Sequence, residues 1–221
     1  MLNRTITKNG RHETEVLKSR FICTIERVND EGEARAVIDR LRKQYWDASH
    51  NCYAWVIGGS GMSQKASDDG EPSGTAGVPM LEVLKRRELT DLVAVVTRYF
   101  GGTKLGAGGL IRAYGHAVTA AIDDVGIVER RPLSVLAISA DYITAGRLEH
   151  SFRNSPFPLK EIEYGSDVTF ITHLEPRHVS TLAAWLAEQT NGAIEPVQLG
   201  EAIVEVPVPR SGETGVTIAD S

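Results

Sequence analysis

Residues 92–112 read LVAVVTRYFGGTKLGAGGLIR, and this stretch decides the fold of the first half of the chain. Its first part, Leu92–Tyr99, is a short and nearly continuous apolar run rich in valine, which is typical of a buried β-strand. A glycine-dense turn follows, and from about Ala107 apolar residues recur at helical spacing as far as Val125. The stretch therefore predicts a buried strand, a glycine turn and an amphipathic helix, in that order.

The residues before this stretch predict further strands and helices. Alternating apolar and polar residues predict two short strands within residues 11–27, separated by a bend near Lys18–Ser19. The other expected elements are a helix capped by Asn29 or Asp30 and reaching about Trp46, a strand over 51–57, and a helix introduced by Thr75 and Pro79. Residues 58–74 contain five glycines, and we interpret them as a loop without a regular element.

The second half of the chain has a pattern of its own, which we expect to begin at Pro132. Strands and helices are predicted over 133–140, 145–154, 159–164, 168–173, 176–189 and 202–208, in the order βαββαβ. That order is typical of a split βαβ, ferredoxin-like unit. We therefore predict an α+β protein with two domains, 1–130 and 131–208, followed by a flexible tail over 209–221.

Composition indicates an ordinary globular protein with an uneven charge. Of 221 residues, 42% are hydrophobic and 24% are charged, which excludes a disordered chain. The net charge of −5 is concentrated after residue 130, where 6 Lys and Arg stand against 12 Asp and Glu. No apolar run reaches the ~18 residues that cross a bilayer, and residues 1–16 contain no apolar signal core. We expect a cytoplasmic protein whose Cys23 and Cys52 are reduced, buried thiols.

The glycine turn and the helix after it are the candidate binding surface. Glycines allow backbone N–H groups to approach a ligand closely, and the N-terminus of a helix attracts anions. Lysine and arginine side chains add positive charge, and Tyr99 and Phe100 offer stacking faces. The candidate ligand-binding residues are Arg98, Tyr99, Gly101, Gly102, Lys104, Gly106, Gly108, Gly109 and Arg112, with Gly74, Thr75 and Gly77 from the preceding glycine segment. For a single glycine, a turn without any ligand explains the residue equally well.

An acidic loop before residue 75 supplies the supporting residues of this site. We expect residues 67–74 to lie beside residues 98–109, so that Asp68, Asp69 or Glu71 can hold Arg98 or Arg112, with His50 in reach. The same carboxylates are open to other interpretations, as general acids, a Mg²⁺ site or solvated turn residues. No nucleophile–base pair, metal-ligand spacing, Walker loop or dinucleotide fingerprint is present, so we assign no catalytic residue, metal or cofactor.

These segments together resemble the IMPACT/YigZ family. The resemblance is carried by HNCYA (50–54), GEPSGTAG (70–77), RYFGGTKLG (98–106) and GGLIRAY (108–114). It implies a first domain with the βαβ fold of a ribosomal small-subunit protein and of elongation factor G. It also implies a ferredoxin-like second domain similar to another elongation factor G module.

Three functions remain open on the sequence alone. The first is a translation regulator that binds RNA, the ribosome or another phosphate-rich ligand through the glycine-rich basic surface. The second is an enzyme that acts on a phosphorylated small molecule, and the third is a protein-interaction module. We favour the first and lean against an enzyme.

Overall fold

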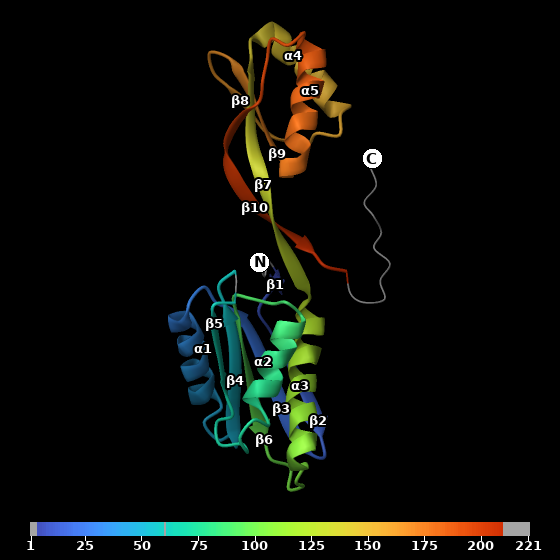
Figure 1. Ribbon diagram of the computed structural model, residues 1–221. Helices are drawn as coiled ribbons and strands as arrows, with labels where there is room; N and C mark the ends of the chain where they lie inside the picture. Colours follow the sequence, from blue (N-terminus) through green and yellow to red (C-terminus); the bar gives the residue numbers. More distant parts are fainter. Residues whose placement is uncertain (1–3, 60, 210–221) are drawn as a thin grey trace. The chain divides into compact units, whose positions relative to one another are not determined.

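The computed structural model describes residues 4–59 and 61–209 and shows a mixed α/β protein of two compact units (Figure 1). The first unit consists of two segments of the chain, one that ends at Glu129 and one that begins at Val206. The second unit is Arg130–Glu205. The second unit thus ends before the residue 208 that we expected. Of the expected tail, 209–221, all but Pro209 lies outside the described residues. No helix of the described chain is long and apolar enough to cross a membrane.

The division between the two units falls at Glu129 and Arg130, close to the boundary expected near Pro132. The strand predicted to begin at residue 133 starts earlier, however, and Pro132 lies inside the long strand β7, Ile127–Ala140. The first residues of β7, up to Glu129, pair with the short strand β1 (Arg4–Ile6), and its pairing with β9 begins only at Ser134. Proline has no N–H to donate, and Pro132 sits between these two paired stretches, where the strand tolerates it. Strand β7 therefore continues from the first unit into the second.

The first unit is built on an antiparallel sheet with the strand order β2-β3-β6-β4-β5. These strands are β2 (Gly10–Val16), β3 (Ser19–Arg27), β4 (His50–Ile57), β5 (Ser63–Ser67) and β6 (Leu92–Tyr99). Strands β3 and β4 flank β6 and both run antiparallel to it, so they are parallel to each other and, with α1 between them in the chain, form a split βαβ unit. Strand β5 corrects the prediction that residues 58–74 contain no regular element. Its sequence SQKAS has no apolar alternation, and it forms as an edge strand by pairing with β4.

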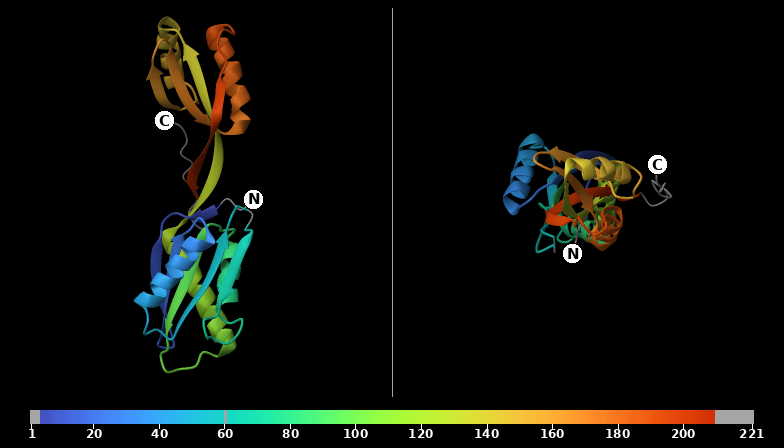
Figure 2. Two further views of the ribbon diagram at one scale, coloured as in Figure 1. Left: turned by 90° about the vertical axis from the view of Figure 1, so that its left-hand side faces the viewer. Right: turned by 90° about the horizontal axis from the view of Figure 1, so that it is seen from above.

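Helices cover both faces of this sheet and make three layers. Helix α1 lies on one face and helices α2 and α3 lie on the other, as Figure 1 and the left view of Figure 2 show. Their bounds are α1 (Glu31–Gln44), α2 (Gly77–Arg86) and α3 (Gly106–Val125). The Asp30 side chain caps α1, as expected, by accepting a hydrogen bond from the Glu33 N–H.

The position of β6 at the centre of the sheet, between two layers of helices, explains why residues 92–96 form a continuous apolar run. Val93 and Val95 pack against α1, whereas Ala94 and Val96 face α2 and α3. A strand between two helical layers buries both of its faces, so its sequence cannot alternate. The same alternation places Arg98 on the α2–α3 side, beneath α3.

The second unit has the predicted order βαββαβ. Its elements after β7 are α4 (Tyr142–Arg153), β8 (Leu159–Tyr164), β9 (Val168–Leu174), a short 3₁₀ turn (Pro176–His178), α5 (Val179–Thr190) and β10 (Val197–Pro207). Strand β9 lies between β7 and β8, and β10 pairs with β7. The two helices cover one face of this sheet, with Phe152, Phe170 and Leu182 in its core.

Candidate functional site

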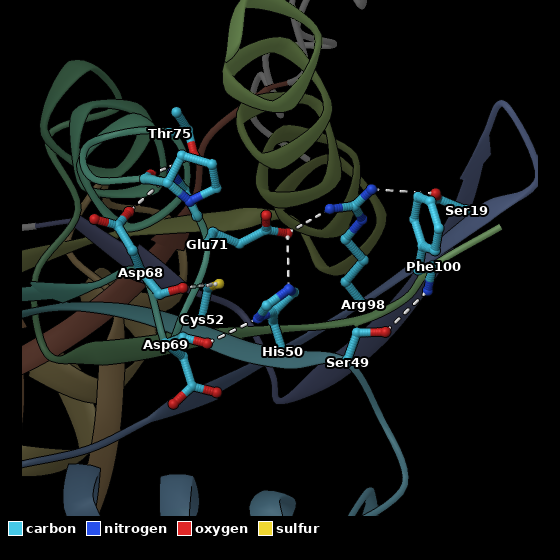
Figure 3. Close-up of polar contacts among 12 residues, drawn as sticks. Ser19, Ser49, His50, Cys52, Asp68, Asp69, Glu71, Thr75, Arg98 and Phe100 are labelled. Atoms are coloured by element: carbon cyan, nitrogen blue, oxygen red, sulfur yellow. Dashed lines mark hydrogen bonds and ion pairs between the residues drawn. The ribbon is translucent and has the colours of Figure 1, made fainter. Parts of the chain in front are cut away.

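The acidic loop and the end of β6 meet in a buried cluster around Glu71, which confirms the expected contact between them. The Arg98 Nη1 atom donates to Glu71 Oε1 at 2.6 Å, and Tyr114 Oη donates to the same oxygen at 2.7 Å. The Arg98 and Glu71 side chains are only 6% and 3% exposed. On its other side, the guanidinium donates through Nη2 to Ser19 Oγ (Figure 3). We call Glu71, Arg98, Tyr114 and Ser19 the Glu71 cluster.

The Glu71 cluster is internal, so its arginine does not face a ligand from outside. A buried charge is tolerated where an opposite charge and hydrogen bonds replace water, and Glu71 and Arg98 provide both for each other. The cluster joins three elements, because Ser19 begins β3, Arg98 lies in β6 and Tyr114 lies in α3. Burial raises the pKa of the Tyr114 hydroxyl, which therefore acts as a neutral donor. We conclude that the Glu71 cluster holds α3 and the acidic loop on the sheet.

Asp68 occupies the glycine segment that was expected to hold an anion. Its carboxylate accepts hydrogen bonds from the N–H groups of Gly74, Ala76 and Gly77 at 2.8 to 3.0 Å. Burial by itself raises the pKa of this carboxyl, but the three backbone donors outweigh burial and leave the pKa below its ordinary value. Thr75 is buried, and its hydroxyl donates to the Pro72 carbonyl. The protein thus supplies its own anion at the start of α2.

His50 and Asp69 form the outer part of the same region. The Asp69 carboxylate accepts from Arg42 Nη2 at 2.6 Å and from the Asn51 N–H at 2.7 Å. The His50 Nδ1 atom lies 2.9 Å from the Asp69 carbonyl oxygen, which can only accept, so this nitrogen carries the proton. His50 Nε2 is then turned toward Glu71 Oε1, 3.9 Å away (Figure 3). These contacts brace the acidic loop, and the cation that Asp69 holds is Arg42 rather than the expected Arg98 or Arg112.

The turn after β6 rests on the hairpin between β2 and β3. A side chain at Gly101 would overlap the backbone of Lys18, so this glycine is required by close packing of two chain segments. The Gly101 N–H donates to Ser19 Oγ, and the Phe100 N–H donates to Ser49 Oγ. Tyr99 is also engaged internally, since its hydroxyl donates to an Asp47 carboxylate oxygen at 2.9 Å.

The rest of the predicted surface faces outward at the start of α3. Its exposed members are Gly102, Lys104, Gly106, Gly108 and Arg112, which we call the α3 entry surface. No side chain caps the N-terminus of α3, and no acidic residue lies in its first turn. Gly109, also predicted, is partly buried and packs against the Leu105 side chain.

Charge on the α3 entry surface is not neutralised within the described part of the chain. Lys104 and Arg112 are exposed, and the described residues provide an ion pair to neither. Phe100, which precedes the glycine turn, is 51% exposed, and the Arg98 guanidinium lies 5.6 Å from the centre of its ring. Uncapped N–H groups, two cations and an exposed aromatic ring can together bind an anionic, ring-containing ligand.

Nothing in the described residues forms a metal centre or an activated thiol. No group of three or more His, Cys, Asp or Glu side chains within residues 4–59 and 61–209 could hold a metal ion. Burial raises the pKa values of Cys23 and Cys52 to about 12, and the Cys52 thiol donates to the Asp68 carbonyl oxygen. These thiols are therefore protonated, buried groups.

Two members of the Glu71 cluster were missed by the sequence analysis. Tyr114 falls within the predicted amphipathic helix, where we counted it as one of the apolar residues, and Ser19 was treated only as part of a bend. The one available signal was the Tyr114 hydroxyl, because a buried tyrosine needs a hydrogen-bond partner. The partner, Glu71, could not be identified from the sequence because it lies 43 residues away in the acidic loop.

Comparisons with known proteins cover both units. The model of the Impact N-terminal domain matches residues 17–122, and that of a domain of unknown function matches residues 138–193. The IMPACT family member YvyE of Bacillus subtilis is 53% identical over 85% of this chain and 87% of its own length. YigZ of Escherichia coli, another IMPACT family member, is 33% identical over 85% and 93%. A crystal structure of a hypothetical protein is 30% identical, covers 89% of this chain and 97% of its own, and has a TM-score of 0.56.

Proposed function

The chain belongs to the IMPACT family, and on that premise we propose that it is a cytoplasmic translation regulator whose α3 entry surface binds the phosphate backbone of RNA. One observation carries the binding proposal. Lys104 and Arg112 stay exposed beside an uncapped helix N-terminus, while the other predicted charges turn inward to partners. The link to translation is supported by the family's resemblance to a ribosomal protein and to modules of elongation factor G.

The physical basis is the electrostatics of a helix start. Unpaired N–H groups and the helix dipole give this end of α3 a partial positive charge, which a phosphate complements. Gly108 has no side chain to cover the backbone there. The space beside its Cα is also open, because a Cβ at this position would meet only the Arg112 guanidinium, at 3.7 Å. A phosphate can therefore approach the backbone between two cations. The Phe100 ring offers a face on which an unpaired base can stack.

The enzyme alternative receives less support from the geometry. An acid–base residue needs a carboxylate that can reach a substrate, but Asp68 is held by three backbone N–H groups and Glu71 by Arg98 and Tyr114. Asp69 is engaged by Arg42 and by the Asn51 N–H. The protein-docking alternative uses the same exposed residues and is separated from RNA binding by experiment.

The test is a titration of the full chain with a fluorescent single-stranded RNA at several salt concentrations. Lys104→Ala and Arg112→Ala should each weaken binding, and each should make the slope of log affinity against log salt shallower by about 0.7. The loss follows from one fewer phosphate contact and one fewer counterion released. A parallel titration with ribosomes shows whether the same residues serve a structured target.

Lys43→Ala is the matched control for charge. Lys43 is an exposed lysine of α1, on the opposite face of the same sheet, so its loss changes net charge equally. If Lys43→Ala and Lys104→Ala weaken binding to the same extent, the interaction is nonspecific and the α3 entry surface is not the site. If the wild-type chain binds neither RNA nor ribosomes at low salt, the protein-docking alternative replaces this proposal.

A further inference from the structure

A cavity of about 480 Å³ lies at the opposite end of α3 from the α3 entry surface. All of its lining residues belong to the first unit. Three arginines line it, Arg4 from β1, Arg86 at the end of α2 and Arg87 immediately after that helix. Apolar side chains that include Ile122 and Ile127 complete the lining. Its volume is within the range of small-molecule sites, and its lining combines apolar side chains with charged ones.

The arginines of this cavity are weakly engaged. Arg86 has no ion pair within the described chain, and its Nε atom donates only to the Glu82 carbonyl oxygen at 3.3 Å. Arg87 pairs with Asp123 at 2.9 Å, and their side chains are 35% and 53% exposed. Arg4 pairs with Glu88 at 3.2 Å and, more loosely, with Glu129 at 3.8 Å, and these carboxylates are 63% and 30% exposed. Ion pairs with such exposed partners contribute little, so an incoming anion can replace them.

The preference of a helix C-terminus for positive charge explains only some of the arginines that line the cavity. Arg86 and Arg87 lie at the C-terminal end of α2, where a positive charge offsets the helix dipole. Lys85 already does this in the same turn, however, and Arg4 reaches the cavity from a strand. Neither the presence of three arginines in one lining nor the apolar residues of that lining follow from the charge preference of a helix end.

We infer that this cavity binds an organic phosphate of mononucleotide size. A guanidinium presents paired N–H donors that match phosphate oxygens, and three arginines line this one cavity. The apolar side chains suit the ring of a nucleobase. The Asp123 carboxylate, also in the lining, can accept from a ribose hydroxyl or an amino group. This inference does not depend on RNA binding at the α3 entry surface.

The two sites can be tested separately because α3 has 20 residues. At 1.5 Å per residue, its ends lie about 30 Å apart. Isothermal titration of the full chain with AMP should show saturable binding of one equivalent. Arg86→Ala should weaken it about tenfold or more, as the loss of a charge-assisted hydrogen bond predicts, and Arg86→Lys should restore part of the loss. Arg112→Ala, at the other end of α3, should leave AMP affinity unchanged.

Arg35→Ala is the matched control, because Arg35 is an exposed, ion-paired arginine of α1 that does not line the cavity. Thermal melts of every variant check that the fold is intact. Inorganic phosphate and adenosine, titrated alone, should each bind more weakly than AMP, because each fills only half of the site. The inference is overturned by the absence of saturable AMP binding up to roughly 1 mM. It is also overturned by equal AMP affinity in Arg86→Ala and wild type, or by phosphate binding as tightly as AMP.

Discussion

Replacing Arg98 with methionine tests whether the Glu71 cluster is structural. The substitution keeps a long side chain but leaves the Glu71 carboxylate, which is 3% exposed, without its cation. Breaking a buried pair in this way costs about 3–5 kcal/mol, because one charge remains buried without compensation. For a domain of this size, about 2–4 °C is lost per kcal/mol, so the melting midpoint of the first unit should fall by roughly 6–20 °C.

The control is an exposed Arg–Glu pair of similar length in the same unit. Arg20 Nε lies 2.7 Å from Glu13 Oε1, but these side chains are 51% and 39% exposed. Arg20→Met should therefore leave the midpoint nearly unchanged. Differential scanning calorimetry measures both variants and separates the transitions of the two units. Equal midpoints for Arg98→Met and Arg20→Met would refute the reasoning.

A double-mutant cycle sharpens the same test. Glu71→Gln alone leaves the Arg98 charge buried and unpaired, so it should also destabilise the first unit strongly. The double variant Glu71→Gln with Arg98→Met leaves no buried charge and should cost less than the sum of the two single changes. Strictly additive costs would show that the two side chains do not stabilise each other.

Two further outcomes follow from the same contacts. Gly101→Ala should lower the free energy of unfolding because its Cβ overlaps the Lys18 backbone, whereas Gly108→Ala, with open space in a helix, should raise it by about 0.5–1 kcal/mol. Chemical denaturation measures both, and the reverse ranking would contradict the packing described here. Asp68→Asn should destabilise the protein at neutral pH, but the difference from wild type should shrink as pH falls. The lowered pKa of Asp68 means that its stabilisation is complete above the ordinary value and is lost as pH drops through the folded value. A difference that stays constant from about pH 6 to pH 2, the range over which carboxylates titrate, would count against this role.

Elements with a strong local pattern were predicted well from the sequence. The valine run of β6, the Asp30 cap of α1 and the apolar stripe of α3 each depend on neighbouring residues only, and the structure confirms them. Elements that depend on distant partners were not. Strand β5 is polar and forms because β4 lies beside it. A strand running through Pro132 was not predicted, because the proline is tolerated there only through its place between the stretches of β7 that pair with β1 and with β9.

The candidate site divides in the same way. From the sequence, Arg98 and Lys104 are equivalent cations at the ends of a glycine turn. In the structure, Arg98 shares a face of β6 with Ala94 and Val96, so α3 buries it against Glu71, whereas Lys104 lies beyond the strand and stays in water. The alternation of side chains along β6 could have shown that Arg98 points to a covered face of the sheet. It could not show that Glu71 would be the acidic partner or that α3 would be the covering helix.

The sequence by itself therefore determined the two α/β units, the order of most of their elements, and a glycine-rich turn carrying positive charge before a helix. Only the tertiary structure decided which charges face a ligand. Hydrophobic periodicity and turn chemistry act between residues that are near in the chain, so they can be read locally. Burial and ion pairing act between residues that the fold brings together, as it brings Ser19, Glu71 and Arg98 into one buried cluster beneath Tyr114.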